Sequence, residues 1–138
     1  MNMTAERILQ ILLVDDHAPT REEIRILIER EIDMRVVGES GSGEEAVKDA
    51  RRMQPDVVVM DINLPRMNGI EATRIISREL PLTRVVALSN HASRSLAQAI
   101  LNAGGLGYVR KDRAFEELVG AIRATGSGRS FLGVHVGD

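Results

Sequence analysis

Short apolar runs alternate along this chain with stretches in which apolar residues recur at helical spacing. Five runs have the length and composition of strands, and each leads into polar or charged residues: 8–14, 34–38, 55–61, 84–88 and 108–109. The intervening stretches repeat apolar residues every three or four positions and predict helices over 19–32, 44–53, 70–78, 92–103 and 115–125. In the last helix, the residues expected to face inward are Phe115, Leu118, Val119 and Ile122.

Strands that alternate with helices favour a parallel sheet with helices on both faces. Right-handed crossovers and a reversal of strand order then give a flavodoxin-like, doubly wound α/β fold, with five strands in the order 2-1-3-4-5 and five helices. A chain of 138 residues is long enough for one domain with a real core. We expect that domain over 1–125, followed at 126–138 by a linker or flexible tail with four Gly and two Ser.

Composition narrows the function classes. The net charge of -2 favours neither polyanions nor an anionic membrane surface, and the absence of cysteine excludes disulfide and thiolate chemistry. The N-terminus shows no signal-peptide pattern, and the apolar runs are far too short to span a bilayer. These features predict a cytoplasmic protein that does not associate with membranes.

One of the five apolar runs, 55–61, ends in an aspartate. Val57 to Met60 is uninterrupted and apolar, as in a strand buried on both faces, and it leads directly into Asp61. Pro65 lacks an N–H and cannot continue a ladder, so the strand should end before it. In open α/β sheets, ligands bind at the carboxyl ends of the strands. We interpret Asp61 as a nucleophile that accepts a phosphoryl group.

Other polar residues follow the neighbouring strands. Asp15 and Asp16 come after the first strand, Ser89 after the fourth and Lys111 after the fifth. Because strands one, three, four and five are neighbours in the proposed order, these side chains should face the same crevice as Asp61. Asp15-Asp16 alone could be an ordinary turn, and Lys111 alone an ordinary surface lysine. Because all of these residues follow neighbouring strands, a shared site with Asp61 is favoured over these separate explanations.

Clustered carboxylates need a counter-charge. A like-charged pair at about 4 Å costs about 4 kcal/mol at an effective dielectric of 20. Mg²⁺ relieves this repulsion, because it prefers an octahedron of oxygens and usually keeps several waters. We expect one oxygen each from Asp16 and Asp61 and the backbone carbonyl of Asn63 as ligands. Asp15 either binds the ion directly or holds a metal-bound water.

The remaining residues suit phosphoryl transfer. Lys111 supplies a charged donor for phosphoryl oxygens, and Ser89 offers a hydroxyl to the same oxygens. Phosphoryl transfer depends mainly on positioning and charge neutralisation, and an ionised Asp is already a competent nucleophile. No general base is required, and we read His17 and His91 as polar loop residues.

With these residues in place, the chain resembles the receiver domain of bacterial two-component response regulators, which has a CheY-like fold. The resemblance covers about residues 7–125, and the matching motifs are LLVDDH at 12–17, VVVMDINLPRMNG at 57–69, Ser89 and GYVRKD at 107–112. VVGESGSGEEAV at 36–47 and SNH at 89–91 look most like the NarL/FixJ (LuxR-type) class, in which a helix-turn-helix DNA-binding domain usually follows.

The resemblance implies a phosphoacceptor in a phosphorelay, and not an enzyme beyond its own phosphorylation and slow dephosphorylation. Asp61 would take a phosphoryl group from a sensor histidine kinase, with Mg²⁺ held by Asp15 and Asp16. Lys111 would bind the phosphoryl group, and Ser89 and Tyr108 would act as the conformational switch. Activation would then drive homodimerisation or effector output, with transcription controlled through a DNA-binding domain that this chain does not contain.

Two positions depart from the family pattern. Asn90 stands where many receivers have Ala or Gly, which predicts altered phosphotransfer or dephosphorylation kinetics, and Asp112 stands where many other classes have Pro. Asn90 also leaves a second function open, namely a degenerate receiver that acts as a phosphorylation-independent interaction module. A third is a metal-dependent phosphatase acting on small molecules. The dimer surface, whether helices one and five or the face around strand five, stays open.

The segment Gly41-Ser42-Gly43-Glu44-Glu45-Ala46 fits the dinucleotide pattern G-x-G-x-x-A. Two features argue against that function. Glu44 and Glu45 occupy the helix N-terminus where a pyrophosphate would bind. The segment also follows strand two, which the proposed order places at the edge of the sheet.

Overall fold

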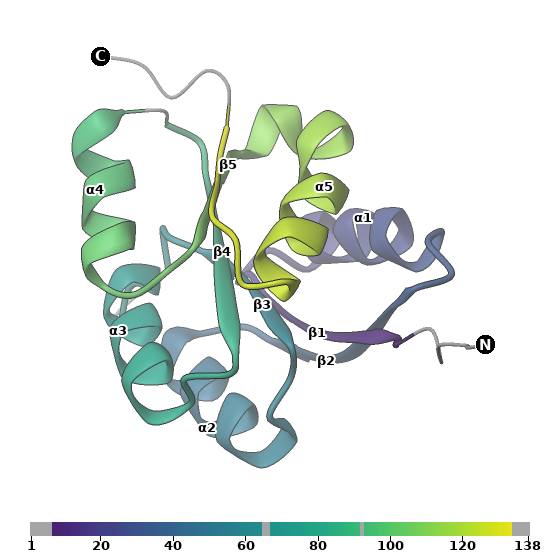
Figure 1. The fold of residues 1–138 in the computed structure, drawn as a ribbon, viewed down its shortest axis with the longest axis horizontal. Coiled ribbons are helices and arrows are strands. Elements are labelled where there is room, and N and C mark those ends of the chain that lie inside the picture. The colour runs from purple at the N-terminus through teal and green to yellow at the C-terminus, as the bar shows by residue number, and fades with distance from the viewer. Residues whose placement is uncertain (1–6, 65–66, 92, 134–138) are drawn as a thin grey trace.

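The computed structural model describes residues 7–64, 67–91 and 93–133. Its described part forms one parallel sheet with the strand order β2-β1-β3-β4-β5-β6 (Figure 1). The strands are β1 (Leu9–Val14), β2 (Met34–Ser40), β3 (Val57–Asp61), β4 (Arg84–Ser89), β5 (Gly107–Arg110) and β6 (Phe131–Leu132). The helices are α1 (Ala18–Glu29), α2 (Gly43–Met53), α3 (Gly69–Glu79), α4 (Arg94–Asn102) and α5 (Ala114–Gly126), with a short 3-10 turn η1 (Lys111–Arg113).

Helices cover both faces of the sheet, with α1 and α5 on one side and α2, α3 and α4 on the other (Figure 1). Strand β3 shows why the apolar runs are continuous. Val57 and Val59 pack with α1 and α5, whereas Val58 and Met60 pack with α2 and α3. Successive strand residues point to opposite faces, so a strand covered on both sides has to be apolar at every position.

The predicted order of the first five strands is confirmed, but the predicted number of strands is too low. A sixth strand, β6, lies within the segment expected to be a linker or flexible tail. It runs parallel to β5, with Phe131 opposite Gly107 and Leu132 opposite Tyr108. The Phe131 N–H donates to the Leu106 carbonyl at 2.9 Å, and the Gly133 N–H donates to the Tyr108 carbonyl at 2.8 Å. The sequence pattern does not predict β6, because a strand of two residues after a Gly- and Ser-rich turn is too short to show strand periodicity.

Two apolar residues lie outside the core in which helical spacing would place them. The first helix ends at Glu29, three residues earlier than predicted, and Ile32 is 91% exposed in the turn before β2. Phe115, predicted to face inward, is 70% exposed. It lies in the first turn of α5 and lines a small groove together with Thr20, Glu23 and Leu88. Leu118 and Ile122 on the same helix are fully buried, and Val119 packs partly buried against the same core.

The glycines of the dinucleotide-like segment have structural roles. The segment follows β2, and β2 lies at the edge of the sheet, as predicted from the sequence. The Gly41 N–H, which such a fingerprint would offer to a phosphate, donates instead to Glu45 Oε1 at 2.8 Å. A Cβ on Gly43 would lie 2.4 Å from the Met67 carbonyl oxygen, so glycine allows α2 to pack closely there.

Several predicted features involve residues outside the described part of the chain. These are the strand stop at Pro65, the start of the fourth helix at Ala92, and the tail from 134 to 138. Within the described part, we find no helix with the length and apolar character needed to cross a membrane.

Phe131 is expected to stabilise the domain although it lies beyond α5. Its ring packs partly buried against the core cluster formed by α1, α5 and the sheet, whereas Leu132 is 45% exposed. Phe131→Ala should lower the free energy of unfolding by about 1–2 kcal/mol, less than for a fully buried Phe. Leu132→Ala is the matched control, expected within about 0.5 kcal/mol of the wild type. Urea unfolding measures both, and an effect of Phe131→Ala no larger than that of Leu132→Ala would contradict a stabilising contact between the Phe131 ring and the core.

Candidate functional site

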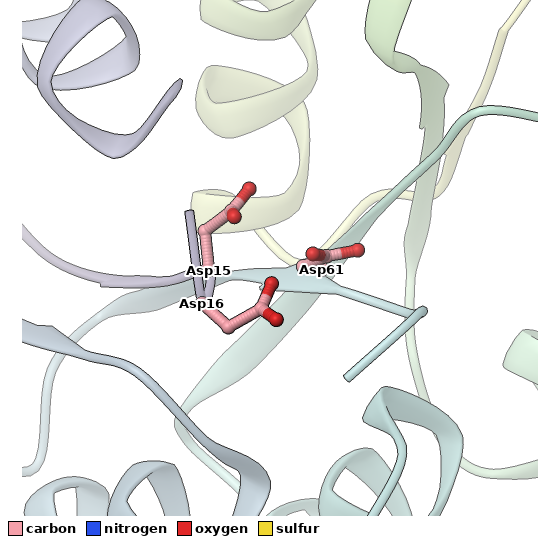
Figure 2. A group of neighbouring side chains, drawn as sticks. All are labelled: Asp15, Asp16 and Asp61. Carbon is pink, nitrogen blue, oxygen red and sulfur yellow. The ribbon is translucent and has the colours of Figure 1, made fainter. Parts of the chain in front are cut away.

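Three aspartates meet at the carboxyl edge of the sheet, where β1 and β3 end side by side (Figure 2). Asp61 is the last residue of β3, and Asp15 and Asp16 directly follow β1. Asp15 and Asp61 are each 2% exposed, whereas Asp16 is exposed. One carboxylate oxygen from each residue lies within 4.8 Å of the other two. The structure therefore brings together the three acids that the strand pattern selected.

The chain beyond β3 folds tightly around Asp61. The Asn63 N–H donates to Asp61 Oδ1 at 2.9 Å, and the Gly69 N–H donates to the Ile62 carbonyl at 3.0 Å. A Cβ on Gly69 would lie 2.3 Å from the Asp61 carbonyl oxygen. Only glycine lets α3 begin this close to the end of β3. Asn63 thus lies in the loop after β3, as expected. Its contact with Asp61 is made by its N–H, whereas the predicted metal ligand is its carbonyl.

Lys111 reaches the acidic cluster from the end of β5. Its Nζ lies 3.2 Å from Asp61 Oδ2 and 3.4 Å from Asp15 Oδ2. The lysine side chain is 20% exposed, so these two ion pairs are shielded from most of the solvent. Shielded pairs interact more strongly than surface pairs. Lys111 is therefore the counter-charge that partly offsets the repulsion between the two buried carboxylates.

The surroundings raise the pKa of Asp61 above its ordinary value. Burial is the largest cause, because it penalises the charged form of the carboxyl, and the nearby Asp15 carboxylate acts in the same direction. The Asn63 N–H and the Lys111 ammonium oppose the rise. The carboxyl is thus held in a costly environment that a further cation would relieve.

Asp15 supplies an oxygen that fits such a cation. Its N–H donates to the Ser40 carbonyl at 3.0 Å, and its Oδ1 accepts from the His17 N–H at 2.8 Å. Its Oδ2 is buried and has no hydrogen-bond partner among the described residues. The Lys111 Nζ is near enough for attraction, but it does not form a hydrogen bond to this oxygen. A buried oxygen without a hydrogen bond, beside two further carboxylates, is a donor set suited to a hard divalent cation.

The two residues predicted to form the switch contact the same backbone segment. Ser89 is fully buried at the end of β4, and its Oγ accepts from the His91 N–H at 3.1 Å. Tyr108 is fully buried beside α4, packed with Ala97 and Ile100, and its hydroxyl donates to the His91 carbonyl. Ser93, and not Ser89, caps α4 by accepting from the Leu96 N–H. Ser89 and Tyr108 are thus joined through the main chain of His91.

Some contacts at the site carry no signal in the sequence. His17 lies in a loop as predicted, but its Nδ1 also accepts from the Thr20 N–H and caps α1, a task for which Ser, Thr, Asp or Asn is usual. The role of His91 comes from its main chain, which any residue possesses. Arg21 donates to the Asp15 carbonyl, and Asp112 pairs with Arg110. An arginine in an amphipathic helix is expected on its solvated face.

The chain matches the family described as the response regulator receiver domain over residues 11–123. It is 40% identical over 124 residues to the response regulator UvrY of Escherichia coli strain K12, a match that covers 90% of this chain and 57% of that protein. It is 34% identical over 127 residues to the transcriptional regulatory protein DegU of Brevibacillus brevis, covering 92% of this chain and 54% of the relative. The chain therefore spans little more than half the length of these relatives.

Solved structures agree with this assignment. A LuxR-family two-component response regulator from Aurantimonas sp. SI85-9A1 superposes with a TM-score of 0.90 at 40% identity, covering 94% of this chain and 92% of that one. The response regulator domain of Thermotoga maritima CheB gives a TM-score of 0.81 at 31% identity, covering 88% and 98%. The chain belongs to the response regulator receiver family.

Asp61→Asn is expected to stabilise the folded protein at neutral pH when no divalent cation is present. Because the folded-state pKa of Asp61 is raised, its contribution to stability is fully present below the unfolded pKa of about 3.9 and is lost as pH rises through the folded-state value. The variant lacks this loss. Its advantage in unfolding free energy should grow from about pH 4 towards neutrality and then level off.

Urea unfolding in the presence of a chelator, repeated across that pH range, measures this advantage. A difference between Asp61→Asn and wild type that does not change with pH would show that burial does not raise the pKa of Asp61.

Proposed function

We propose that this chain is a phosphoacceptor receiver that takes a phosphoryl group on Asp61 from a sensor histidine kinase. The observation that carries the proposal is the buried Asp61 carboxylate, with Lys111 3.2 Å from one of its oxygens and two further acids beside it. Membership of the receiver family supports the donor and the reaction class. The cytoplasmic location expected from the sequence stays a prediction.

The transfer is a displacement at phosphorus. An Asp61 carboxylate oxygen forms the new P–O bond, the P–N bond to the donor phosphohistidine breaks, and the imidazole nitrogen keeps the electron pair. Lys111 then redirects its charge from the carboxylates to the phosphoryl oxygens, and Ser89 offers its hydroxyl to the same group. The Asn63 N–H holds Asp61 Oδ1 throughout, which orients the other oxygen. No group has to remove a proton from the nucleophile.

We assign Mg²⁺ to the acidic cluster. Asp16 and Asp61 would each give one oxygen and the Asn63 carbonyl another. The Oδ2 of Asp15, which accepts no hydrogen bond among the described residues, would bind the ion or one of its waters. When bound, the ion neutralises negative charge on the carboxylates and the phosphoryl group. Aspartate and carbonyl oxygens are the ligands that Mg²⁺ prefers.

The output follows from the main-chain link between Ser89 and Tyr108. When Ser89 Oγ turns to the phosphoryl group, its bond to the His91 N–H is lost. The His91 carbonyl accepts a hydrogen bond from the Tyr108 hydroxyl, so the same movement changes the position of Tyr108. The surface formed by α4, β5 and α5 changes with it. Tyr108 is already buried in this structure. The change would be a shift between two populated states and not a one-way insertion of the ring.

We propose homodimerisation on activation and control of transcription through a further domain. The names of the relatives UvrY and DegU support a regulatory output, and DegU is called a transcriptional regulatory protein. A receiver boundary near residue 125 stays a prediction, and the sheet continues to Leu132. The alternative, a phosphorylation-independent interaction module, has only Asn90 in its favour.

Acetyl phosphate with Mg²⁺ is expected to label the wild-type protein on one residue, and Asp61→Asn should abolish the labelling. Intact mass spectrometry measures the added phosphoryl group. Asp56→Asn is the matched control, because Asp56 precedes β3 at the opposite end of the strand and pairs with Arg7. It should be labelled like the wild type.

Equal labelling of Asp61→Asn and wild type would show that the nucleophile is another residue. A wild type that takes up no phosphoryl group would favour the degenerate module, whereas turnover of a phosphomonoester far beyond stoichiometry would favour a phosphatase.

Asn90→Ala is expected to speed labelling by acetyl phosphate several-fold. Asn90 is exposed directly after the buried Ser89, and we propose that its side chain limits the approach of the phosphoryl donor to the carboxyl edge. Shortening it leaves the acids and Lys111 untouched. Time courses of the mass shift at limiting acetyl phosphate measure the rate, and an unchanged or slower rate would contradict a gating role for Asn90.

A further inference from the structure

Arg21 lies in α1 and contacts the acidic cluster through the main chain. Its Nη1 donates to the Asp15 carbonyl, and its Nε donates to Glu39 Oε1 at 2.8 Å. The side chain is 20% exposed, so it is mostly covered by its neighbours. One guanidinium therefore joins α1, the loop after β1 and the end of β2. The planar fork of arginine allows this double contact, which the single ammonium of lysine reproduces poorly.

These contacts leave Asp15 little freedom. Its N–H is bound by Ser40 on β2, its carbonyl by Arg21, and its Oδ1 by the His17 N–H. The remaining polar atom, Oδ2, is buried without a hydrogen bond among the described residues and points to the space shared with Asp61 and Lys111. The orientation of Oδ2 thus depends on the peptide plane that Arg21 holds.

We propose that Arg21 is a positioning residue that sets the cation affinity of the cluster by fixing the main chain of Asp15. The inference rests on the proposed binding of Mg²⁺ and deepens it. Groups that orient a metal ligand from outside the coordination sphere commonly change affinity by about 10- to 100-fold when removed. Arg21 acts in this way through Asp15 and does not itself touch the ion.

A purely electrostatic role makes the opposite prediction. A guanidinium near three carboxylates competes with a cation, so its removal would tighten Mg²⁺ binding if charge alone mattered. The ion pair with Glu39 reduces that effect, because the charge of Arg21 is already balanced. Positioning and charge therefore predict changes of opposite sign, and one pair of variants separates them.

The experiment is a Mg²⁺ titration of the whole chain, followed by NMR through the shift of the Asn63 amide. Arg21→Met removes both the fork and the charge, while Arg21→Lys keeps the charge. We expect Mg²⁺ binding to weaken about tenfold in Arg21→Met and by a smaller but clear factor in Arg21→Lys. Arg25→Met is the matched control, since Arg25 also pairs with Glu39 but, among the described residues, forms no hydrogen bond or ion pair with Asp15. Its affinity should stay within about twofold of wild type.

The affinities of the two Arg21 variants distinguish a positioning role from a charge effect. Tighter binding in Arg21→Met with no change in Arg21→Lys would assign a charge effect and overturn the proposal, as would unchanged affinity in both. If Arg21→Met does not fold, Arg21→Lys alone carries the test. Lower stability alone does not mimic the result, because the titration reports on folded molecules.

A wild type that shows no Mg²⁺-dependent shift at millimolar concentration would overturn the metal assignment and this inference together. Binding by wild type and Arg25→Met, with unchanged Arg21 variants, would overturn this inference alone.

Discussion

A carboxylate buried at the end of the central strand is the constraint on which the rest of the structure depends. Asp61 is 2% exposed, and burial raises its pKa, so the fold has to supply compensating donors. The Asn63 N–H supplies one from the next loop, and Lys111 supplies the other from η1, directly after β5, which lies two strands away in the sheet. Neither donor alone reaches both oxygens. The strand order therefore determines which donors reach Asp61, as well as how the core packs.

The same edge connects the site to the rest of the domain through main-chain bonds. Ser89 and Tyr108 meet at the backbone of His91, and Tyr108 lies opposite Leu132 of β6. A buried ring joined to a loop carbonyl on one side and a strand pair on the other moves in few ways. Closely packed interiors favour discrete alternatives over gradual deformation. That property suits the two-state change that we propose for Ser89 and Tyr108.

The predictions that succeeded rest on strong local periodicity. The continuous run from Val57 to Met60 specified a strand covered on both faces, and the polar residues that follow each strand specified the edge. Those that failed involve positions where periodicity ends. Ile32 continues the spacing of α1 but lies past its last turn. Phe115 has the spacing of α5 but lies in its first turn, where its side chain is largely exposed. Apolar spacing predicts a common face, and it does not say whether a neighbour covers that face.

By itself, the sequence determined the fold class, the order of the first five strands and the residues that gather near Asp61, because buried strands and their polar ends leave a pattern in residue type. Only the tertiary structure decided how those residues are held. The bond from Arg21 to the Asp15 carbonyl, the meeting of Ser89 and Tyr108 at His91 and the pairing of β6 all involve main-chain groups. Every residue carries such groups, so their partners are set by distances between elements and leave no mark on residue type.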